Sequence, residues 1–374
     1  MASLDQISYL DVPLNPYVAD YDLDLRSYSE CETRRCDEDV WREYGLLRDT
    51  RQVPRDASSP GHQKLVDDKV ITEDLDVVIA YKTNIQEAEL GALPCIVYIH
   101  GGNRYGGTPY SGFLERAEVW AARFDAIAIS VNYRLSPNEP DESPTGEEPT
   151  NDCFDALTWL YHRLGADEDS ILKHGDRTKL IVFGTSAGGG LAASTVMKWC
   201  QERRQGFSET HGDLYGLVLE APQLDDRCNT QSHDKFKHGN MYTSRDAEQG
   251  WEASLGARRG TEHVSIFEAP ARAVDTDVKG FPPTYIEVGG AEPFRDEVEN
   301  LSNTLRKAKV EVEMNVWEGG FHGFFTAEPN ALVSRLCNLT KLRWLCRRLG
   351  VQDKGIDDEY DEVKEAYDAR PKGG

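Results

Sequence analysis

A single serine lies inside a glycine-rich stretch that reads LIVFGTSAGGG at residues 180–190. The apolar run before it is typical of a buried strand, and the residues from Ala187 onward have the spacing of a helix. Gly184 and Gly188 flank Ser186 in the pattern G-x-S-x-G, which presents a serine hydroxyl above a sheet as a nucleophile. Neither common phosphate-binding glycine pattern fits these residues. A glycine-rich turn without chemistry is the alternative, so partners elsewhere in the chain must decide.

A serine nucleophile needs a base, and histidine suits this role because its ordinary pKa lies near neutrality. His322 follows a predicted strand, inside the glycine-rich loop EGGFHGFF. Six other histidines lie in charged, loop-like contexts and are interpreted as solvated: His62, His174, His211, His233, His238 and His263. Since carboxylates lie between Ser186 and His322, the chain order is that of a Ser–acid–His triad. We therefore predict His322 as the base, over a loop histidine that only binds backbone.

The acid that orients this histidine should follow the carboxyl end of the preceding strand, TYIEV at residues 284–288. Pro293 favours an extended Glu292 just before the next helix. Asp296 and Glu297 fall in the first turn of that helix, where a carboxylate stabilises the helix dipole. We therefore predict Glu292 as the orienting acid and keep Asp296 as the alternative.

Backbone N–H groups that face a developing oxyanion are the third requirement of acyl transfer. Ala187, directly after the serine, can supply one. The stretch YIHGGNRYGG follows an apolar strand, and Gly101 and Gly102 allow its backbone to approach a substrate closely. His100 is expected to brace this loop by hydrogen bonding. An ordinary tight turn is the alternative interpretation of HGG by itself.

The elements that must position these residues alternate along the chain. Strand-like runs (PCIVYIH, AIAISVNY, LIVFG, LYGLVLEA, TYIEV, VEVEMNVWE) alternate with helical stretches. Such alternation predicts a mostly parallel sheet with helices on both faces. The run KVITEDLDVVIAYK at residues 69–82 predicts an early antiparallel pair. Two segments are charged and weakly patterned: residues 1–60, which contain helix-like patches, and residues 223–280. The composition from Val351 onward predicts a polar, frayed tail.

Composition excludes several classes of protein. The chain has 374 residues, with 65 Asp and Glu against 42 Lys and Arg and a formal net charge of −23, which argues against nucleic acid as a partner. We see neither an apolar run near the roughly 20 residues that span a bilayer nor a secretory signal. The eight Cys are typical of free thiols in a reducing compartment, so we expect a cytoplasmic protein. No metal-binding motif is present, and we expect no metal and no cofactor.

Together these stretches resemble the hormone-sensitive-lipase-like family of carboxylesterases, which has the α/β-hydrolase fold. The similarity runs from about residue 65 to residue 350. It includes HGG, NYRLSPNEP, GTSAGG, APQLDDR, EPFRDE and GGFHGF. The motif GTSAG resembles that of the branch of the family in which Thr precedes the nucleophile.

The resemblance implies three roles for residues of this chain: nucleophile (Ser186), base (His322) and oxyanion donors (Gly101, Gly102 and Ala187). Two positions depart from the family's pattern. The family's HGGG reads HGGN, with Asn103 in place of a third glycine, and the usual Asp of the acid motif is Glu292. Glutamate can orient a histidine as aspartate does.

The resemblance further implies a lid formed by residues 1–60 and 223–280 on a catalytic domain of residues 61–350, followed by a polar tail at 351–374. We expect a serine carboxylesterase that hydrolyses small short-acyl esters through an acyl-enzyme. The first alternative is an arylformamidase, another amidase or a lactonase. The second is an inactive small-molecule-binding protein, as the plant gibberellin receptors are. The predicted partner is a small ester, with no nucleic acid and no membrane, and a homodimer is a candidate assembly.

Overall fold

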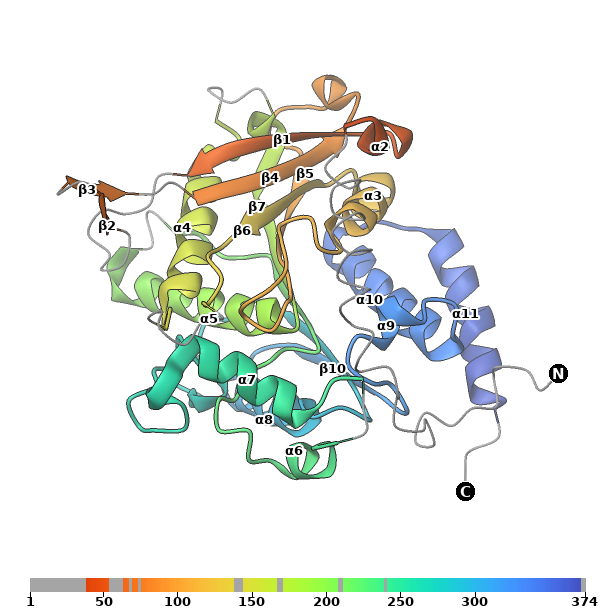
Figure 1. The fold of residues 1–374 in the computed structure, drawn as a ribbon. Helices are drawn as coiled ribbons and strands as arrows, with labels where there is room; N and C mark the ends of the chain where they lie inside the picture. Colours follow the sequence, from red (N-terminus) through yellow and green to blue (C-terminus); the bar gives the residue numbers. More distant parts are fainter. Residues whose placement is uncertain are drawn as a thin grey trace.

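A computed structural model describes residues 38–53, 63–66, 69–72, 75–137, 144–166, 171–207, 211–238 and 241–370. Its centre is an eight-stranded sheet in the order β1-β4-β6-β5-β7-β8-β9-β10 (Figure 1). The strands are β1 (Leu46–Val53), β4 (Leu75–Lys82), β5 (Leu93–Ile99), β6 (Ile127–Asn132), β7 (Gly175–Thr185), β8 (Gly216–Glu220), β9 (Thr284–Gly289) and β10 (Val312–Trp317). Only β4 runs antiparallel to its neighbours in the sheet, β1 and β6. The predicted mostly parallel sheet is therefore confirmed.

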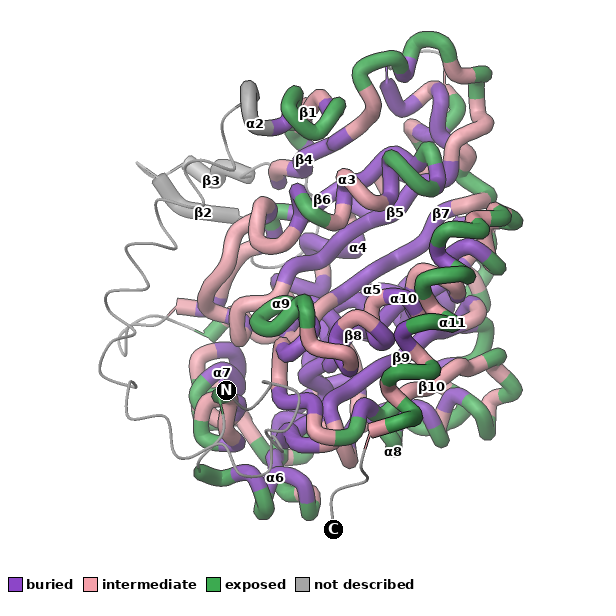
Figure 2. Tube along the Cα trace, turned by 90° about the vertical axis from the view of Figure 1, so that its right-hand side faces the viewer, coloured by how far each residue is buried: buried purple, intermediate pink, exposed green. Residues whose placement is uncertain are grey.

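Helices cover both faces of this sheet. One face carries α4 (Glu148–Arg163), α5 (Ala187–Glu202) and α8 (Arg295–Lys307), and the other carries α3 (Phe113–Phe124) and α10 (Leu332–Leu349). Helix α7 (Ser244–Leu255), in the connection between β8 and β9, adds side chains to the first of these cores. Strand β5 shows why, because Val97 and Ile99 enter one core while Ile96 and Tyr98 enter the other. Figure 2 shows the central strands as almost continuously buried between these helices.

The N-terminal strands differ from the sequence prediction. Within residues 69–82, β3 (Lys69–Thr72) pairs with β2 (Gln63–Val66), whereas β4 pairs with β1, so the predicted antiparallel pair was wrong. The first described residues form α2 (Glu38–Glu43), which is followed by β1. Strand β1 lies at the edge of the sheet, and only its two end residues are buried. Because the residues between them are mostly charged or polar, the sequence shows no strand-like apolar pattern there. Of the predicted N-terminal lid of residues 1–60, residues 46–53 thus belong to the central sheet. Residues 1–37 and 54–60 of this prediction lie outside the described residues.

The C-terminal stretch is a helix where we predicted a frayed tail. Helix α11 (Lys354–Asp368) begins at Asp353, whose side chain accepts a hydrogen bond from the amide of Ile356 (3.1 Å). Ile356 and Val363 lie on one side of it and are buried in the core that α10 also enters. Its acidic composition concealed this short apolar stripe. The prediction that this segment is frayed is therefore wrong as far as Asp368.

A cluster of buried charges lies between the sheet and the helices α3 and α10. Glu220 at the end of β8 accepts hydrogen bonds from Arg116 Nη2 and from Thr185 Oγ1, both at 2.6 Å. Lys341 on α10 binds both Glu220 and Glu287, the latter at 2.6 Å. Two carboxylates thus face two cations. The backbone oxygen of Glu220 also accepts a hydrogen bond from the amide of Ser186, the residue after Thr185. The buried charges are therefore linked directly to the end of β7.

We expect Lys341→Met to lower the free energy of unfolding by about 3–5 kcal/mol, because it removes the cation that binds both buried carboxylates, Glu220 and Glu287. Burial alone raises the pKa of the Glu220 carboxyl, but the charges of Arg116 and Lys341 outweigh this and hold it at about 2. The stabilisation is therefore present above the ordinary pKa of 4.5 and is lost as the pH falls through about 2.

Urea unfolding at pH 7 measures this effect. The matched control is Lys364→Met, which removes the lysine of an exposed ion pair with Asp368 on α11 and should change stability little. Equal unfolding midpoints for Lys341→Met and the wild type would contradict the prediction.

Candidate active site

Ser186 forms the sharp turn between β7 and α5. Its backbone has φ 56° and ψ −121°, a left-handed φ that non-glycine residues rarely adopt. Hydrogen bonds hold this conformation on both sides. The Ser186 amide donates to the Glu220 carbonyl (2.8 Å), and its carbonyl accepts from the amides of Gly189 (2.9 Å) and Gln223 (3.0 Å). The turn is thus fixed by the strand beside β7 and by the first turn of α5.

The glycines around Ser186 are required by close backbone contacts. A Cβ on Gly184 would lie 2.3 Å from the carbonyl oxygen of Gly188. A Cβ on Gly188 would lie 2.2 Å from the carbonyl oxygens of Ile99 and His100. The start of α5 therefore lies directly against the end of β5. This contact brings the loop after β5 next to the serine, as the pattern G-x-S-x-G predicts.

Three side chains from three loops form one hydrogen-bonded line. Ser186 Oγ lies 2.9 Å from His322 Nε2, and His322 Nδ1 lies 2.6 Å from Glu292 Oε2. Since a carboxylate only accepts, Nδ1–H donates to Glu292 and Nε2 is left to accept from the serine. The other Glu292 oxygen accepts from the amide of Gly289 (2.6 Å), the last residue of β9. Glu292 is fully buried, whereas the His322 side chain is 12% exposed.

The loops that carry the acid and the base are bonded to each other. The amide of Gly290 donates to the carbonyl of Trp317 (2.7 Å), and the amide of Ala291 donates to the carbonyl of Gly320 (2.9 Å). These loops leave the carboxyl ends of β9 and β10, which are parallel neighbours in the sheet. The Glu292–His322 pair is therefore held by backbone contacts as well as by its own hydrogen bond.

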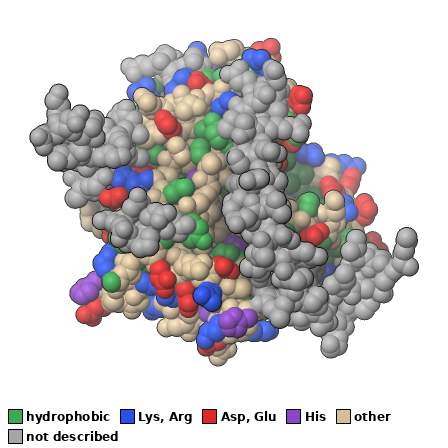
Figure 3. Space-filling model, in the orientation of Figure 1, with side chains coloured by type: hydrophobic (Ala, Val, Ile, Leu, Met, Phe, Trp, Pro, Cys, Tyr) green, Lys and Arg blue, Asp and Glu red, His purple; other side chains and the backbone are tan. Residues whose placement is uncertain are grey.

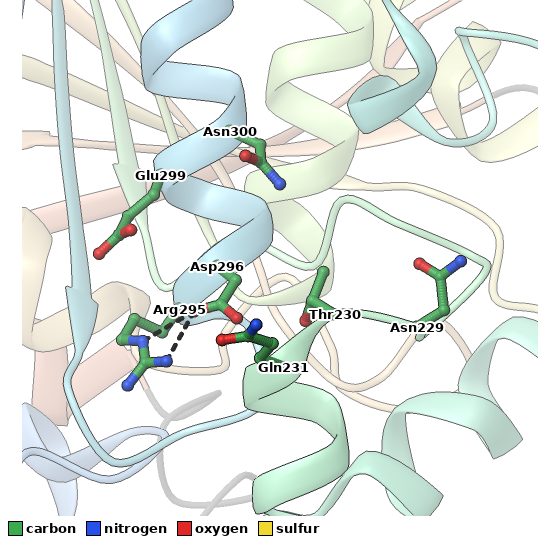
Figure 4. A pocket seen from close by; sticks show the side chains of 7 residues that line it. All are labelled: Asn229, Thr230, Gln231, Arg295, Asp296, Glu299 and Asn300. Carbon is green, nitrogen blue, oxygen red and sulfur yellow. Dashed lines mark hydrogen bonds and ion pairs between the residues drawn. The ribbon is translucent and has the colours of Figure 1, made fainter.

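The other two candidate acids lie elsewhere. Asp296, in the first turn of α8, pairs with Arg295 and accepts from the amide of Ser232 (2.8 Å). Figure 4 shows it in a polar hollow lined by Asn229, Thr230, Gln231, Arg295, Asp296, Glu299 and Asn300. Glu297 is buried with His233, at 3.1 Å from Nε2. The structure therefore brings Glu292, and neither of the other two, to His322.

Three histidines that we interpreted as solvated are buried: His174, His211 and His233, with exposed fractions of 3%, 5% and 0%. The prediction was wrong for them because their packing partners are distant in sequence, such as Glu297 for His233. His238 and His263 are exposed as predicted. His62 lies outside the described residues.

The loop after β5 lies across from the serine. A Cβ on Gly101 would lie 3.2 Å from Ser186 Cβ and 3.8 Å from its Oγ. Gly102 has φ 128°, and a Cβ there would lie 2.0 Å from the carbonyl oxygen of Gly106, so only glycine fits. In the described loops and turns, no backbone hydrogen bond uses the amide of Gly101, Gly102 or Ala187 as its donor. Of the three, Gly101 lies directly against the side chain of Ser186, and Ala187 follows it in the chain.

His100 braces this loop, as expected. Its Nδ1–H donates to the carbonyl of Gly101 (2.7 Å), and the hydroxyl of Tyr133 donates to the His100 carbonyl (2.8 Å). Burial lowers the pKa of His100 to about 4, so the imidazole is neutral near pH 7. His100 therefore shapes the loop and carries no charge into the site.

Two aromatic residues that the sequence did not single out flank the histidine. The ring centroids of Tyr242 and Phe294 lie 4.5 Å and 5.1 Å from that of His322. Tyr242 comes from the charged connection between β8 and β9, where no motif marks it. Phe294 lies inside EPFRDE, where it read as the start of a helix. Together they leave the imidazole with its nitrogens directed at the serine and at the acid.

Three further features concern the described residues only. The six cysteines among them are free and buried. No three of their His, Cys, Asp and Glu side chains gather so as to hold a metal ion. None of the helices in these ranges is long and apolar enough to cross a membrane.

A serine on a strand-to-helix turn, with its histidine and acid on the loops after two later parallel strands, defines the class of α/β hydrolases. Residues 96–326 match the family model described as alpha/beta hydrolase fold, and they include Ser186, Glu292 and His322. The chain belongs to this family, that of the hormone-sensitive-lipase-like carboxylesterases.

Known proteins of several activities are similar to this chain. It is 26% identical over 282 residues to arylacetamide deacetylase of Oryctolagus cuniculus, covering 61% of this chain and 67% of that protein. It is 26% identical over 243 residues to the gibberellin receptor GID1A of Arabidopsis thaliana, covering 64% of each. The solved structure of a bacterial heroin esterase matches with a TM-score of 0.69 and 28% identity, over 92% of this chain and 93% of that one. The alignments with these two curated relatives span about two thirds of their length.

Proposed function

We propose that the chain is a serine carboxylesterase that hydrolyses small short-acyl esters through an acyl-enzyme intermediate. The observation that carries this proposal is the line from Ser186 Oγ through His322 to the buried Glu292. The likeness to an esterase of known structure supports it. The proposed roles are nucleophile for Ser186, base for His322, orienting acid for Glu292, and oxyanion donors for the amides of Gly101, Gly102 and Ala187.

In the first step the serine oxygen attacks the ester carbonyl while His322 Nε2 takes the hydroxyl proton. The carbonyl oxygen becomes an oxyanion, which the three amides stabilise by hydrogen bonds. Collapse of this intermediate breaks the bond to the alcohol, and the histidinium donates its proton to the leaving oxygen. Glu292 keeps its hydrogen bond to Nδ1–H throughout and stabilises the histidinium.

In the second step water replaces the alcohol. His322 takes a proton from this water, whose oxygen attacks the acyl carbon, and the same amides stabilise the second oxyanion. The bond to Ser186 then breaks, and the histidinium returns the proton to the serine oxygen. The products are a carboxylic acid and the unmodified enzyme.

The connection between β8 and β9 supports a bounded substrate site. Tyr242 contacts His322, and Trp251 of α7 is fully buried in the core that α4, α5 and α8 also enter. These contacts fix the connection to the domain beside the site. We propose that residues 223–280 form the predicted lid, and that these contacts hold the lid against the domain. A substrate site bounded by this lid would favour small acyl groups over long chains.

A panel of nitrophenyl esters tests this proposal. We expect the acetate and butyrate to be hydrolysed much faster than the palmitate, with activity that survives EDTA and is lost to a serine-directed organophosphate. Faster hydrolysis of palmitate, or loss of activity to EDTA alone, would contradict the proposal.

The gibberellin receptor among the relatives makes a binding protein the second candidate. The hydrogen bond between Ser186 and His322 favours hydrolysis instead. Aryl formamides and lactones in the same panel distinguish the amidase and lactonase alternatives. A protein that turns over none of these compounds and does not react with the organophosphate would point to binding alone.

A further inference from the structure

Two consecutive residues of the loop after β5 have a left-handed backbone. Asn103 has φ 51° and Arg104 has φ 72°, directly after the tight turn at Gly102. Such a conformation is unfavourable for a residue with a Cβ, although asparagine tolerates it better than most. It persists only where surrounding contacts fix it. These contacts come from the connection between β8 and β9.

Asn103 is bound on both sides of its amide. Its Nδ2 donates to the carbonyl of Asp246 on α7 (2.7 Å), and its Oδ1 accepts from the hydroxyl of Tyr242 (2.8 Å). Gly250, one turn further along α7, makes room for it, because a Cβ there would lie 2.1 Å from Asn103 Oδ1. The side chain at position 103 and the glycine at position 250 therefore fit each other.

Arg104 makes the next contact with the same helix. Its guanidinium carbon lies 3.6 Å from the centroid of the Trp251 ring, and the residue is 3% exposed. Nε and Nη2 are buried without a hydrogen-bond partner, so the stacking on the indole is the close contact that stabilises this cation. Helix α7 thus contacts the loop at two successive residues.

The helix that makes these contacts is itself fixed. Thr243 and Asp246 form a capping box at its start, with the Thr243 amide donating to Asp246 Oδ2 (2.7 Å). Tyr242 immediately precedes this cap and packs on His322. One short segment, residues 242–251, therefore contacts both the loop that carries the proposed oxyanion donors and the proposed base.

We propose that Asn103 and Tyr242 are positioning residues that hold the oxyanion donors Gly101 and Gly102 at the distance from Ser186 that hydrolysis requires. In this chain the side chain at position 103 transfers the rigidity of α7 to the loop. The proposal rests on the proposed esterase function. It makes the connection between β8 and β9 a part of the catalytic geometry as well as a cover.

The first test is Asn103→Gly, which removes the hydrogen bonds of this side chain to Asp246 and Tyr242, together with its longer ones to Tyr105 and Gln223, and also relieves the left-handed strain. We expect kcat for nitrophenyl acetate to fall by about 10- to 100-fold, since small displacements of oxyanion donors have effects of this size, with KM nearly unchanged. The matched control is Lys309→Gly, which places glycine at an exposed left-handed residue (φ 67°) after α8. Its kcat should equal that of the wild type.

The second test is Tyr242→Phe, which keeps the ring against His322 and removes one hydrogen bond to Asn103. We expect kcat to fall by about 5-fold, the effect of one neutral hydrogen bond. Combining it with Asn103→Gly should add no further loss, because the bond is already absent. A double variant whose loss equals the product of the two single losses would overturn the proposed link.

Hydrogen–deuterium exchange separates this inference from the proposed function. Residues 100–107 should exchange faster in Asn103→Gly than in the wild type or in Lys309→Gly, whether or not any ester is hydrolysed. If the wild type is inactive but the exchange differs as expected, the esterase proposal fails while the contact with α7 stands as a structural one. Unchanged exchange, or an Asn103→Gly variant with wild-type kcat, would overturn the inference.

Discussion

Ser186→Ala is expected to lower kcat for nitrophenyl acetate by about 10⁶-fold, the scale found when the nucleophile of a triad is removed. Without Oγ no acyl-enzyme forms, and His322 has no proton to accept. His322→Ala should cause a loss of similar size, and the double variant should be little worse than either single one, because the two groups act as a unit.

The matched control is Ser194→Ala on the same helix, α5. Its hydroxyl is buried and has no hydrogen-bond partner, so removing it should leave kcat unchanged. Mass spectrometry after treatment with a fluorophosphonate should show one adduct on the wild type and on Ser194→Ala, and none on Ser186→Ala. Turnover by Ser186→Ala within 10-fold of the wild type, or an adduct on another residue, would show that the nucleophile lies elsewhere.

Glu292→Gln is expected to lower kcat by about 10³- to 10⁴-fold, near the effect of the same change at a triad aspartate. Both carboxylate oxygens accept hydrogen bonds, one from His322 Nδ1 and one from the Gly289 amide. Glutamine supplies one acceptor and one NH₂ group. Its NH₂ must therefore face a donor at one of the two positions, which breaks that contact or forces the other tautomer of His322.

Asp296→Asn is the control that distinguishes the two candidate acids. It keeps an oxygen that can accept from the Ser232 amide, and it loses the charge at the start of the helix and the hydrogen bonds that Asp296 Oδ1 accepts from Arg295. We expect kcat to be retained and stability to fall by about 0.3–1 kcal/mol. Measuring kcat and melting temperature for both variants decides the assignment. Loss of turnover in Asp296→Asn with activity retained in Glu292→Gln would reverse it.

The sequence was most informative where local backbone geometry restricts residue type. Gly184 and Gly188 must be glycine because carbonyl oxygens lie about 2.2–2.3 Å from where a Cβ would be. Such requirements are visible in a single sequence, and so is the alternation of strands and helices. The positions of Ser186, Glu292 and His322 could be predicted from this alternation, because each residue follows the end of a parallel strand.

What the sequence did not reveal depends on contacts between distant residues. Strand β1 and helix α11 carry many charges, and their few apolar residues became informative only with their partners known. The burial of His233 depends on Glu297, 64 residues away. The role of Asn103 depends on Tyr242 and Gly250, which lie in a connection without any motif. Local patterns contain no trace of such pairs.

The bonded loops after β9 and β10 have a consequence for the order in which the site assembles during folding. Glu292 and His322 are 30 residues apart and belong to one β9–α8–β10 unit, whereas the contact between Ser186 and His322 spans 136 residues. Contacts between nearby segments form faster than contacts between distant ones. The acid and the base can therefore be aligned within a C-terminal unit before the nucleophile arrives on β7. A chain divided between β8 and β9 would carry the acid and the base on one fragment and the serine on the other.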